Sequence, residues 1–196
     1  MGDPKKQRKK FQTPRFAWRK DVLQEELKLL GQYGLRNKHE LWRLKTTLSK
    51  TRGIARSLIG KPTEERVKME NELLTKLKKR GILQETAVLD NVLDLSIEDL
   101  LERRLQTIIF RKGLTRTIFQ SRQLITHGHV TIGDRRITIP GYIVSKEEEG
   151  KITYNPQSVV SKETHPLRQG LAVVAKQPEI RPPSRGRRGE RGGRRF

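Results

Sequence analysis

The sequence predicts an α+β protein with a mostly helical N-terminal domain, a small α/β module of two helices packed on a short-stranded sheet, and disordered basic termini. Apolar residues recur at helical spacing through much of the first two thirds of the chain. Short alternating runs follow between Val130 and Tyr154. The expected division is a basic arm at 1–20, a helical domain at 21–95, the module at 96–154, a segment at 155–175 packed back on the helical domain, and an Arg/Gly/Pro-rich tail at 176–196.

The charge composition indicates what kind of partner the protein binds. The 196-residue chain has a formal net charge of +21, from 43 Lys and Arg against 22 Asp and Glu. This excess exceeds what solubility needs and predicts a polyanionic partner. No apolar run reaches transmembrane length, no signal peptide is visible, and no helix has an apolar face large enough to favour a membrane over nucleic acid. The lack of cysteine excludes disulfides and thiolate zinc sites, and it fits a cytoplasmic location.

The N-terminal arm mixes cations with aromatic residues. Residues 1–20 carry eight Lys or Arg, with Phe11, Phe16 and Trp18 among them. Such a segment is expected to be disordered in the free protein. It can also order on RNA, with its cations on phosphates and its rings stacked or packed in grooves. A plain spacer has no use for the rings, so we expect both states, one free and one bound.

Two helices are expected between residues 21 and 60. The first carries an apolar stripe that includes Leu23 and Leu30, and it stops at the glycines of residues 31–34. The second runs from about Lys38 towards Ile59, and Gly53 can end or kink it. Its cations are either an ordinary exposed face or an RNA contact, and their excess over acids favours RNA. Trp42 is expected in the core.

A third helix and a short fourth are expected before the module. Pro62 stops the second helix, and Thr63 is expected to cap the third, which ends at Gly81 with Val67, Leu74 and Leu77 facing inward. The apolar residues of 82–93 are expected to continue as a short helix that packs the two halves of the chain together.

The module opens with two predicted helices. Ser96 is positioned to cap the first, which carries Leu101, Leu105, Ile108 and Ile109 on one stripe and ends at Gly113. The second begins at Thr115 or Thr117 and ends at Gly128. One arc holds Ile118, Ser121, Leu124 and Ile125, and a narrow opposite arc holds Arg116, Gln120, Gln123 and His127. The polar arc can bind phosphates or base edges while the apolar arc packs.

A hairpin follows the second helix. Val130 and Ile132 are expected on one strand and Ile137 and Ile139 on the next, joined by a turn at residues 133–134. Arg135 and Arg136 would then lie just past its tip. One or two further strands are expected around residues 143–144 and 152–154. The acidic run at 147–149 between them is expected to be a solvated loop.

These motifs together resemble a known family. LERRLQT, RKGL, SRQLITHGHVTI and IPGYIV, in this order, resemble the RNA-binding domain of the fourth small-subunit ribosomal protein, the S-four family. The stretch LDNVLDLSIEDLLERR resembles its archaeal and eukaryotic branch. The resemblance covers roughly residues 10–170. It implies binding of small-subunit ribosomal RNA at a multi-helix junction, an early role in assembly, a position near the mRNA entry side, neighbours among small-subunit proteins, and an influence on translational accuracy.

The candidate RNA contacts are Lys and Arg residues together with two other polar residues, Gln123 and His127. Arg103 and Arg104 have an alternative, which is pairing with acids of their own helix, and the sequence leaves open which of the two faces RNA. The full set is Arg103, Arg104, Arg111, Lys112, Arg116, Arg122, Gln123, His127, Arg135 and Arg136 in the module, and Lys9, Lys10, Arg15, Arg19, Arg43, Lys45, Arg52 and Arg56 before it.

Catalysis has no support in the sequence. The histidines lie in no metal or hydrolase motif, and no phosphate-binding loop or nucleophile elbow is present. We therefore expect no catalytic residue, metal, cofactor or small-molecule substrate. Two hypotheses remain. The first is a structural RNA-binding protein of the cytoplasmic ribosome. The alternative is a subunit of an RNA-modifying enzyme, or a ribosome-rescue factor, that uses the same module; the family also includes pseudouridine synthases and tyrosyl-tRNA synthetases.

Overall fold

The computed structural model describes residues 9–16, 18–60 and 62–169. Predictions for residues 1–8, Ala17, Lys61 and 170–196, the C-terminal tail included, lie outside the described residues. The fold is helical with one small antiparallel sheet, as predicted. Its elements in chain order are α1 (Lys20–Gln32), α2 (Lys38–Ile59), α3 (Thr63–Lys79), α4 (Leu89–Asp94), α5 (Ile97–Glu102), α6 (Leu105–Arg111), α7 (Ile118–Thr126), β1 (Val130–Ile132), β2 (Arg135–Arg136), α8 (Lys146–Glu149), β3 (Ile152–Tyr154) and the 3₁₀ turn η1 (Val159–Ser161).

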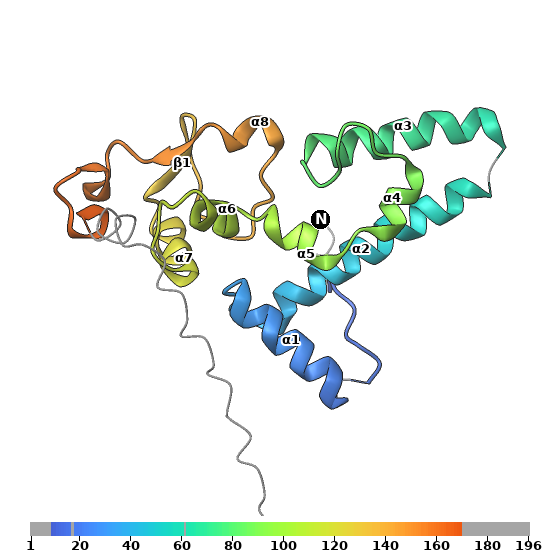
Figure 1. Ribbon diagram of the computed structural model, residues 1–196, viewed down its shortest axis with the longest axis horizontal. Helices are drawn as coiled ribbons and strands as arrows, with labels where there is room; N and C mark the ends of the chain where they lie inside the picture. Colours follow the sequence, from blue (N-terminus) through green and yellow to red (C-terminus); the bar gives the residue numbers. More distant parts are fainter. Residues whose placement is uncertain (1–8, 17, 61, 170–196) are drawn as a thin grey trace, which may run out of the picture.

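The elements gather in two halves. Helices α1 to α5 lie on one side of the molecule, while α6, α7 and the sheet lie on the other (Figure 1). No helix among the described residues is long and apolar enough to span a bilayer.

Helix α2 is the longest element, and its N-terminal boundary has a local cause. Gly34 has φ +56°, which reverses the chain after α1. The Asn37 side chain then accepts a hydrogen bond from the Glu40 amide at 3.1 Å and caps α2. The helix continues past Gly53 to Ile59, so Gly53 does not end it. The expected span of this helix is confirmed.

The α3–α4 region differs from its prediction in three details. Pro62 occupies the N-cap position, and Thr63 is already the first residue of α3. Val67 is 50% exposed and does not face inward. Residues 82–88 are not helical, and α4 is restricted to Leu89–Asp94. Leu89 and Val92 share one core cluster with Leu58 and Leu77 of the helical domain and with Leu100 of the predicted module, so α4 packs the helical domain against the start of the module.

The predicted first helix of the module is two helices, α5 and α6. Ser96 caps α5 through the Asp99 amide, as predicted. The helix then breaks because residues 103–104 pair with residues 142–144: the Leu105 amide donates to the Tyr142 carbonyl at 2.8 Å, and the Val144 amide donates to the Arg103 carbonyl at 3.0 Å. Arg104 is consequently extended, with ψ 141°. These long-range bonds take the place of local helical bonds at the two-residue break.

The sheet has three strands in the order β2-β1-β3, all antiparallel. The hairpin and its two-residue turn are as expected, but its second strand is Arg135–Arg136, paired with Ile132 and Thr131. The two arginines are therefore within the hairpin, and Ile139, expected on the strand, is 62% exposed. The expected strand at 152–154 is β3. Of residues 143–144, only Ile143 forms a bridge, and it pairs with Arg104.

Two further predictions about the C-terminal part need correction. Residues 146–149 form the helical turn α8, because Glu148 and Ser145 make reciprocal capping bonds, where a loop was expected. Among the described residues after β3, which are 155–169, the buried Val160 packs on the module, where packing on the helical half was expected. Val160 is buried in the same cluster as Ile125 and Val130. Its position follows from the bond between Ser158 and His129, whose Oγ and Nδ1 lie 2.7 Å apart.

Candidate nucleic-acid interface

Helix α7 presents the polar arc predicted from the sequence. Thr117 caps it by accepting a hydrogen bond from the Gln120 amide at 3.1 Å. The four residues of the predicted apolar arc are its four buried residues. Arg116, Gln123 and His127 are exposed on the opposite side. The Arg116 guanidinium has no hydrogen bond or ion pair within the described part of the chain, so its charge is available to a ligand.

Strand β2 adds two exposed arginines beside the end of α7. Gly128 follows the helix with φ +76°, and an added Cβ there would lie 2.1 Å from Nε of Arg136. The Arg136 side chain therefore lies over Gly128, next to His127. Arg116, Gln123, His127, Arg135 and Arg136 form what we call the α7–β2 surface. Its positive potential reaches His129, whose pKa is lowered by burial and by the charges of His127 and Arg136.

Arg104 and Arg122, both expected at RNA, converge instead on one carboxylate of the helical half. Arg104 Nη2 lies 2.7 Å from Glu40 Oε2, and Arg122 Nη2 lies 2.7 Å from Glu40 Oε1. The Arg104 side chain is only 4% exposed. Although burial favours protonation of the carboxyl, the two arginines hold the pKa of Glu40 below its ordinary value. This cluster joins α2 to the module, so Arg104 and Arg122 have a structural role.

The remaining module cations are also engaged within the protein. Arg103 pairs with Glu149 at 2.7 Å and donates to the Val144 carbonyl at 3.1 Å. It therefore does not pair with acids of its own helix. Arg111 holds both oxygens of Glu102, which also accepts a hydrogen bond from Tyr33. Burial and this bond raise the pKa of Tyr33 to about 12. Lys112 donates to the carbonyl of Glu149.

The helical half divides its candidate cations between free and paired. Arg43 is exposed and, with Arg104 and Arg122, lines a hollow at the seam between the two halves. Lys45 and Lys38 pair with Glu26, at 3.2 and 3.3 Å. Glu26 is 2% exposed and also accepts a bond from Trp42. Burial acts to raise its pKa, but these three donors hold the pKa of Glu26 below the ordinary value.

Arg52 and Arg56 lie on the other side of α2 from Arg43. Both line a shallow hollow beside Ile97. The Arg52 guanidinium donates to the carbonyl of Leu95, so it bridges α2 to the chain between α4 and α5, while Arg56 is exposed.

The described part of the arm is partly packed on α2. The Phe11 ring stacks on His39 with 4.8 Å between centroids, and the Gln12 amide donates to Thr46. Lys9 and Lys10 are exposed, and Arg15 and Arg19 lie over the Phe16 ring. Trp18 is 90% exposed, the largest exposed fraction among the described large apolar residues.

The sequence did not reveal the roles of Glu26, Glu40 and Gln106, which hold the cations and the two halves of the molecule in place. Glu26 and Glu40 read as ordinary helix residues, although each holds two cations. Gln106 is fully buried, and its Nε2 donates to the carbonyls of Gly34 and Ile118 at 3.0 and 3.1 Å. A polar residue inside an apolar helical run was the one available signal for Gln106. Among the described residues, no group of three or more His, Asp or Glu side chains could hold a metal ion.

Comparison with known proteins gives one consistent family. The S4 domain family profile matches residues 103–149, which run from the helix break to the end of α8. Small ribosomal subunit protein uS4 of Hyperthermus butylicus is 53% identical over 83% of this chain and 92% of its own length. The protein of the same name from Saccharolobus solfataricus is 53% identical over 79% of this chain and 86% of its own. That of Thermoplasma acidophilum is 44% identical over 89% of both.

Proposed function

Because the chain belongs to the uS4 family of small ribosomal subunit proteins, we propose that it is a structural constituent of the small ribosomal subunit and that it binds the ribosomal RNA of that subunit. The alignments with these relatives cover 86 to 92% of the relatives' lengths and 79 to 89% of this chain. The proposal therefore concerns the chain as a whole and not one shared module. It assigns the chain a role in positioning RNA, with no catalytic step, and a place in the cytoplasm with the ribosome.

The observation that carries the proposal is the contrast between paired and free cations. Seven Lys and Arg side chains of the candidate set are held by acids or by carbonyls distant in the sequence, whereas Arg56 makes only a local 3.5 Å bond from Nε to the Arg52 carbonyl. The seven are Arg103, Arg104, Arg111, Lys112, Arg122, Lys45 and Arg52. On the α7–β2 surface, by contrast, Arg116 and Arg135 have no ion pair within the described chain. Exposed and uncompensated arginine is what a phosphate backbone needs.

The RNA contacts we propose are therefore a revised set. Arg116, Gln123, His127, Arg135 and Arg136 bind from the module. Arg43 and Arg56 bind from α2, and Lys9, Lys10, Arg15 and Arg19 bind from the arm. Trp18 joins them as a ring on which an unpaired base stacks. Arg104 leaves the set because its guanidinium is buried against Glu40.

In the proposed mechanism, the protein fixes the relative positions of RNA helices. Cations on two halves that are joined at one seam can neutralise the crowded phosphates of several RNA helices at once. Such a protein suits a multi-helix junction, and by holding the junction it would nucleate subunit assembly and support accurate decoding. Neighbouring small-subunit proteins, and mRNA near its entry side, complete the proposed surroundings.

The experiment that tests the proposal is sedimentation of the endogenous protein through a sucrose gradient at low and high salt. Stoichiometric migration with the small subunit that survives moderate salt is the expected result. Migration at the top of the gradient, or partial association that salt removes, would overturn it and would direct attention to turnover on free RNA.

A further inference from the structure

One segment of this basic protein has the opposite charge. Residues 81–102 hold six carboxylates, namely Glu85, Asp90, Asp94, Glu98, Asp99 and Glu102, and none of the 43 Lys and Arg residues. The segment spans α4, α5 and the loop before them. In Figure 1, α4 lies between α3 and α2, and α5 leads from there to α6 in the middle of the molecule.

Three of these acids have partners within the protein, and the side chains of two others have none among the described residues. Asp99 caps α5, Glu102 holds Arg111, and Glu85 pairs with Lys146. Asp90 and Asp94 are exposed and make no hydrogen bond or ion pair with any other described residue. Their charges add to a field that repels a phosphate backbone, so this side is poorly suited to RNA.

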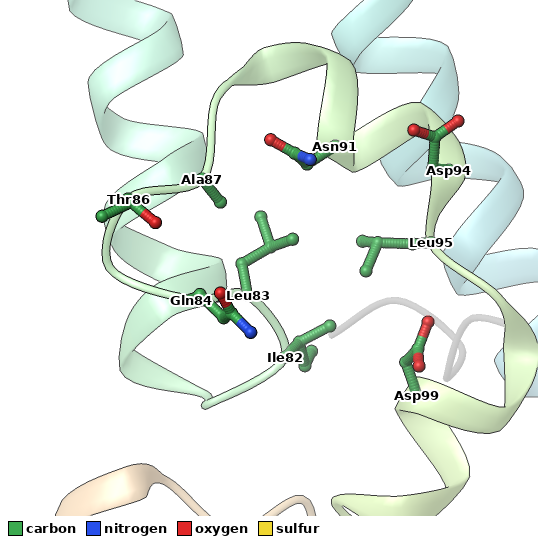
Figure 2. A pocket seen from close by; sticks show the side chains of 9 residues that line it. All are labelled: Ile82, Leu83, Gln84, Thr86, Ala87, Asn91, Asp94, Leu95 and Asp99. Atoms are coloured by element: carbon green, nitrogen blue, oxygen red, sulfur yellow. The ribbon is translucent and has the colours of Figure 1, made fainter.

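The same segment surrounds a hollow with an apolar floor. Figure 2 shows Ile82, Leu83 and Leu95 directed into the hollow, with Asp94 and Asp99 on one rim. Ile82 and Leu83 are only half-buried, and Val88 of the same loop is 57% exposed. The hollow is also lined by Gln84, Thr86 and Asn91, so it offers a small apolar floor within a polar rim that can receive one apolar side chain of another protein.

We propose that this hollow, with its acidic rim, is a docking surface for a Lys/Arg-rich segment of another protein that inserts an apolar side chain between Leu83 and Leu95. Charge complementarity selects the partner: cations of the segment meet Asp90, Asp94 and Glu98. The apolar floor requires that the segment carry more than charge. The inference goes beyond RNA binding and does not depend on it, because it uses none of the residues assigned to RNA.

The test is an NMR titration of the full-length, ¹⁵N-labelled protein with three probes. The first is a peptide of Lys and Arg around two central leucines, the second has serines in place of the leucines, and the third is a short oligouridylate. The leucine peptide is expected to shift amides of residues 82–99 and to bind several-fold more tightly than the serine peptide.

Two charge reversals sharpen the titration. Asp94→Lys is expected to weaken the leucine peptide about fivefold. Asp94 is the last residue of α4, where a cation suits the helix dipole, so this change does not threaten the fold. The matched control Glu72→Lys lies on the exposed face of α3, outside the hollow, and is expected to leave the affinity within twofold of the wild type.

Three outcomes would overturn the docking surface. They are an absence of shifts at 82–99 with the leucine peptide, equal binding of the serine peptide, and shifts of the same amides by the oligouridylate. The last would make this side an RNA surface. Failure of the oligouridylate to shift the α7–β2 surface would count against the RNA proposal alone.

Discussion

Glu40 and Arg122 lie 82 positions apart in the sequence, and their side chains form a 2.7 Å ion pair that joins helix α2 to helix α7. Arg104 shares the same carboxylate from the side. One acid of the helical half therefore anchors two cations of the module. The cluster contains two positive charges and one negative charge. Glu40 is therefore the residue that the cluster depends on, because it is the only counter-ion of both arginines in this cluster.

Removing the Glu40 charge is expected to destabilise the whole protein. Glu40→Gln keeps the side-chain volume but leaves Arg104 buried without a counter-ion, which costs about 2 to 3 kcal/mol, below the range for a fully buried pair because Glu40 is partly exposed. Chemical denaturation monitored by circular dichroism measures the loss. Glu72→Gln, on the exposed face of α3, should change the free energy of unfolding by less than about 0.5 kcal/mol. An unchanged midpoint for Glu40→Gln would show that the cluster does not stabilise the seam.

Removing free arginines is expected to weaken RNA binding without unfolding the module. Arg116→Ala with Arg136→Ala should lower the affinity for a ribosomal RNA junction about tenfold and reduce the slope of log K against log salt by about 1.5. Filter binding at several salt concentrations gives both numbers. Lys68→Ala with Lys76→Ala removes the same charge from the exposed face of α3. If both doubles lose affinity equally, binding is diffuse and the α7–β2 surface has no special role.

Acid is expected to destabilise the protein through Glu26 and Glu40, each of which is paired with two cations. The pKa of Glu26 and of Glu40 is lower in the folded protein than the ordinary 4.5. A depressed pKa stabilises the fold above the unfolded value, and this contribution disappears as pH falls through the folded value. The free energy of unfolding should therefore drop below pH 4.5. Glu26→Gln should be less stable than the wild type at pH 7, with the gap closing in acid, while Glu25→Gln, exposed on the same helix, should follow the wild-type curve throughout.

Gly128 is expected to tolerate no side chain. Gly128→Ala places a Cβ at φ +76° and against the Arg136 guanidinium, so about 1 to 2 kcal/mol of stability should be lost and Arg136 displaced. Gly31→Ala is the matched control: Gly31 lies in helix α1 with nothing within 4 Å of the added Cβ, and alanine there should stabilise the protein by about 0.5 to 1 kcal/mol. Thermal melts of the two variants should move in opposite directions, and a common direction would refute the backbone argument.

Trp18 is expected to report RNA binding directly. The chain has two tryptophans, so the Trp42→Phe variant leaves Trp18 as the only one. Stacking of a base on its exposed ring should quench the fluorescence when RNA is added, and Trp18→Ala should reduce the binding free energy by about 1 to 3 kcal/mol. Fluorescence that does not respond to saturating RNA would assign the ring to another partner.

Local patterns predicted local structure well. The caps at Ser96 and Thr117, the glycine that ends α7, and the buried arc of that helix all follow from neighbours within four positions. The largest miss in the module has a long-range cause. The break between α5 and α6 depends on bonds to residues 142–144, which helical periodicity cannot register.

The candidate site shows the same division. The polar arc of α7 was readable because exposure follows from helical phase. The pairing of Arg104 and Arg122 was not, because Glu40 lies in a different half of the chain. An arginine beside an acid in space looks the same in sequence as an arginine left free for a phosphate.

The buried Gln106 amide fixes more than its own position. It ties the carbonyl of Gly34 in the helical half to that of Ile118 in the module, and an added Cβ at Gly34 would lie 2.7 Å from Ile118. Because these contacts are so close, the two halves cannot rotate relative to each other at this point. The loss of interdomain freedom occurs during folding, so the RNA that we propose as ligand would meet a preorganised protein, and its binding energy would not be spent on aligning the two halves. The RNA helices would then have to adopt the angle that the protein already holds.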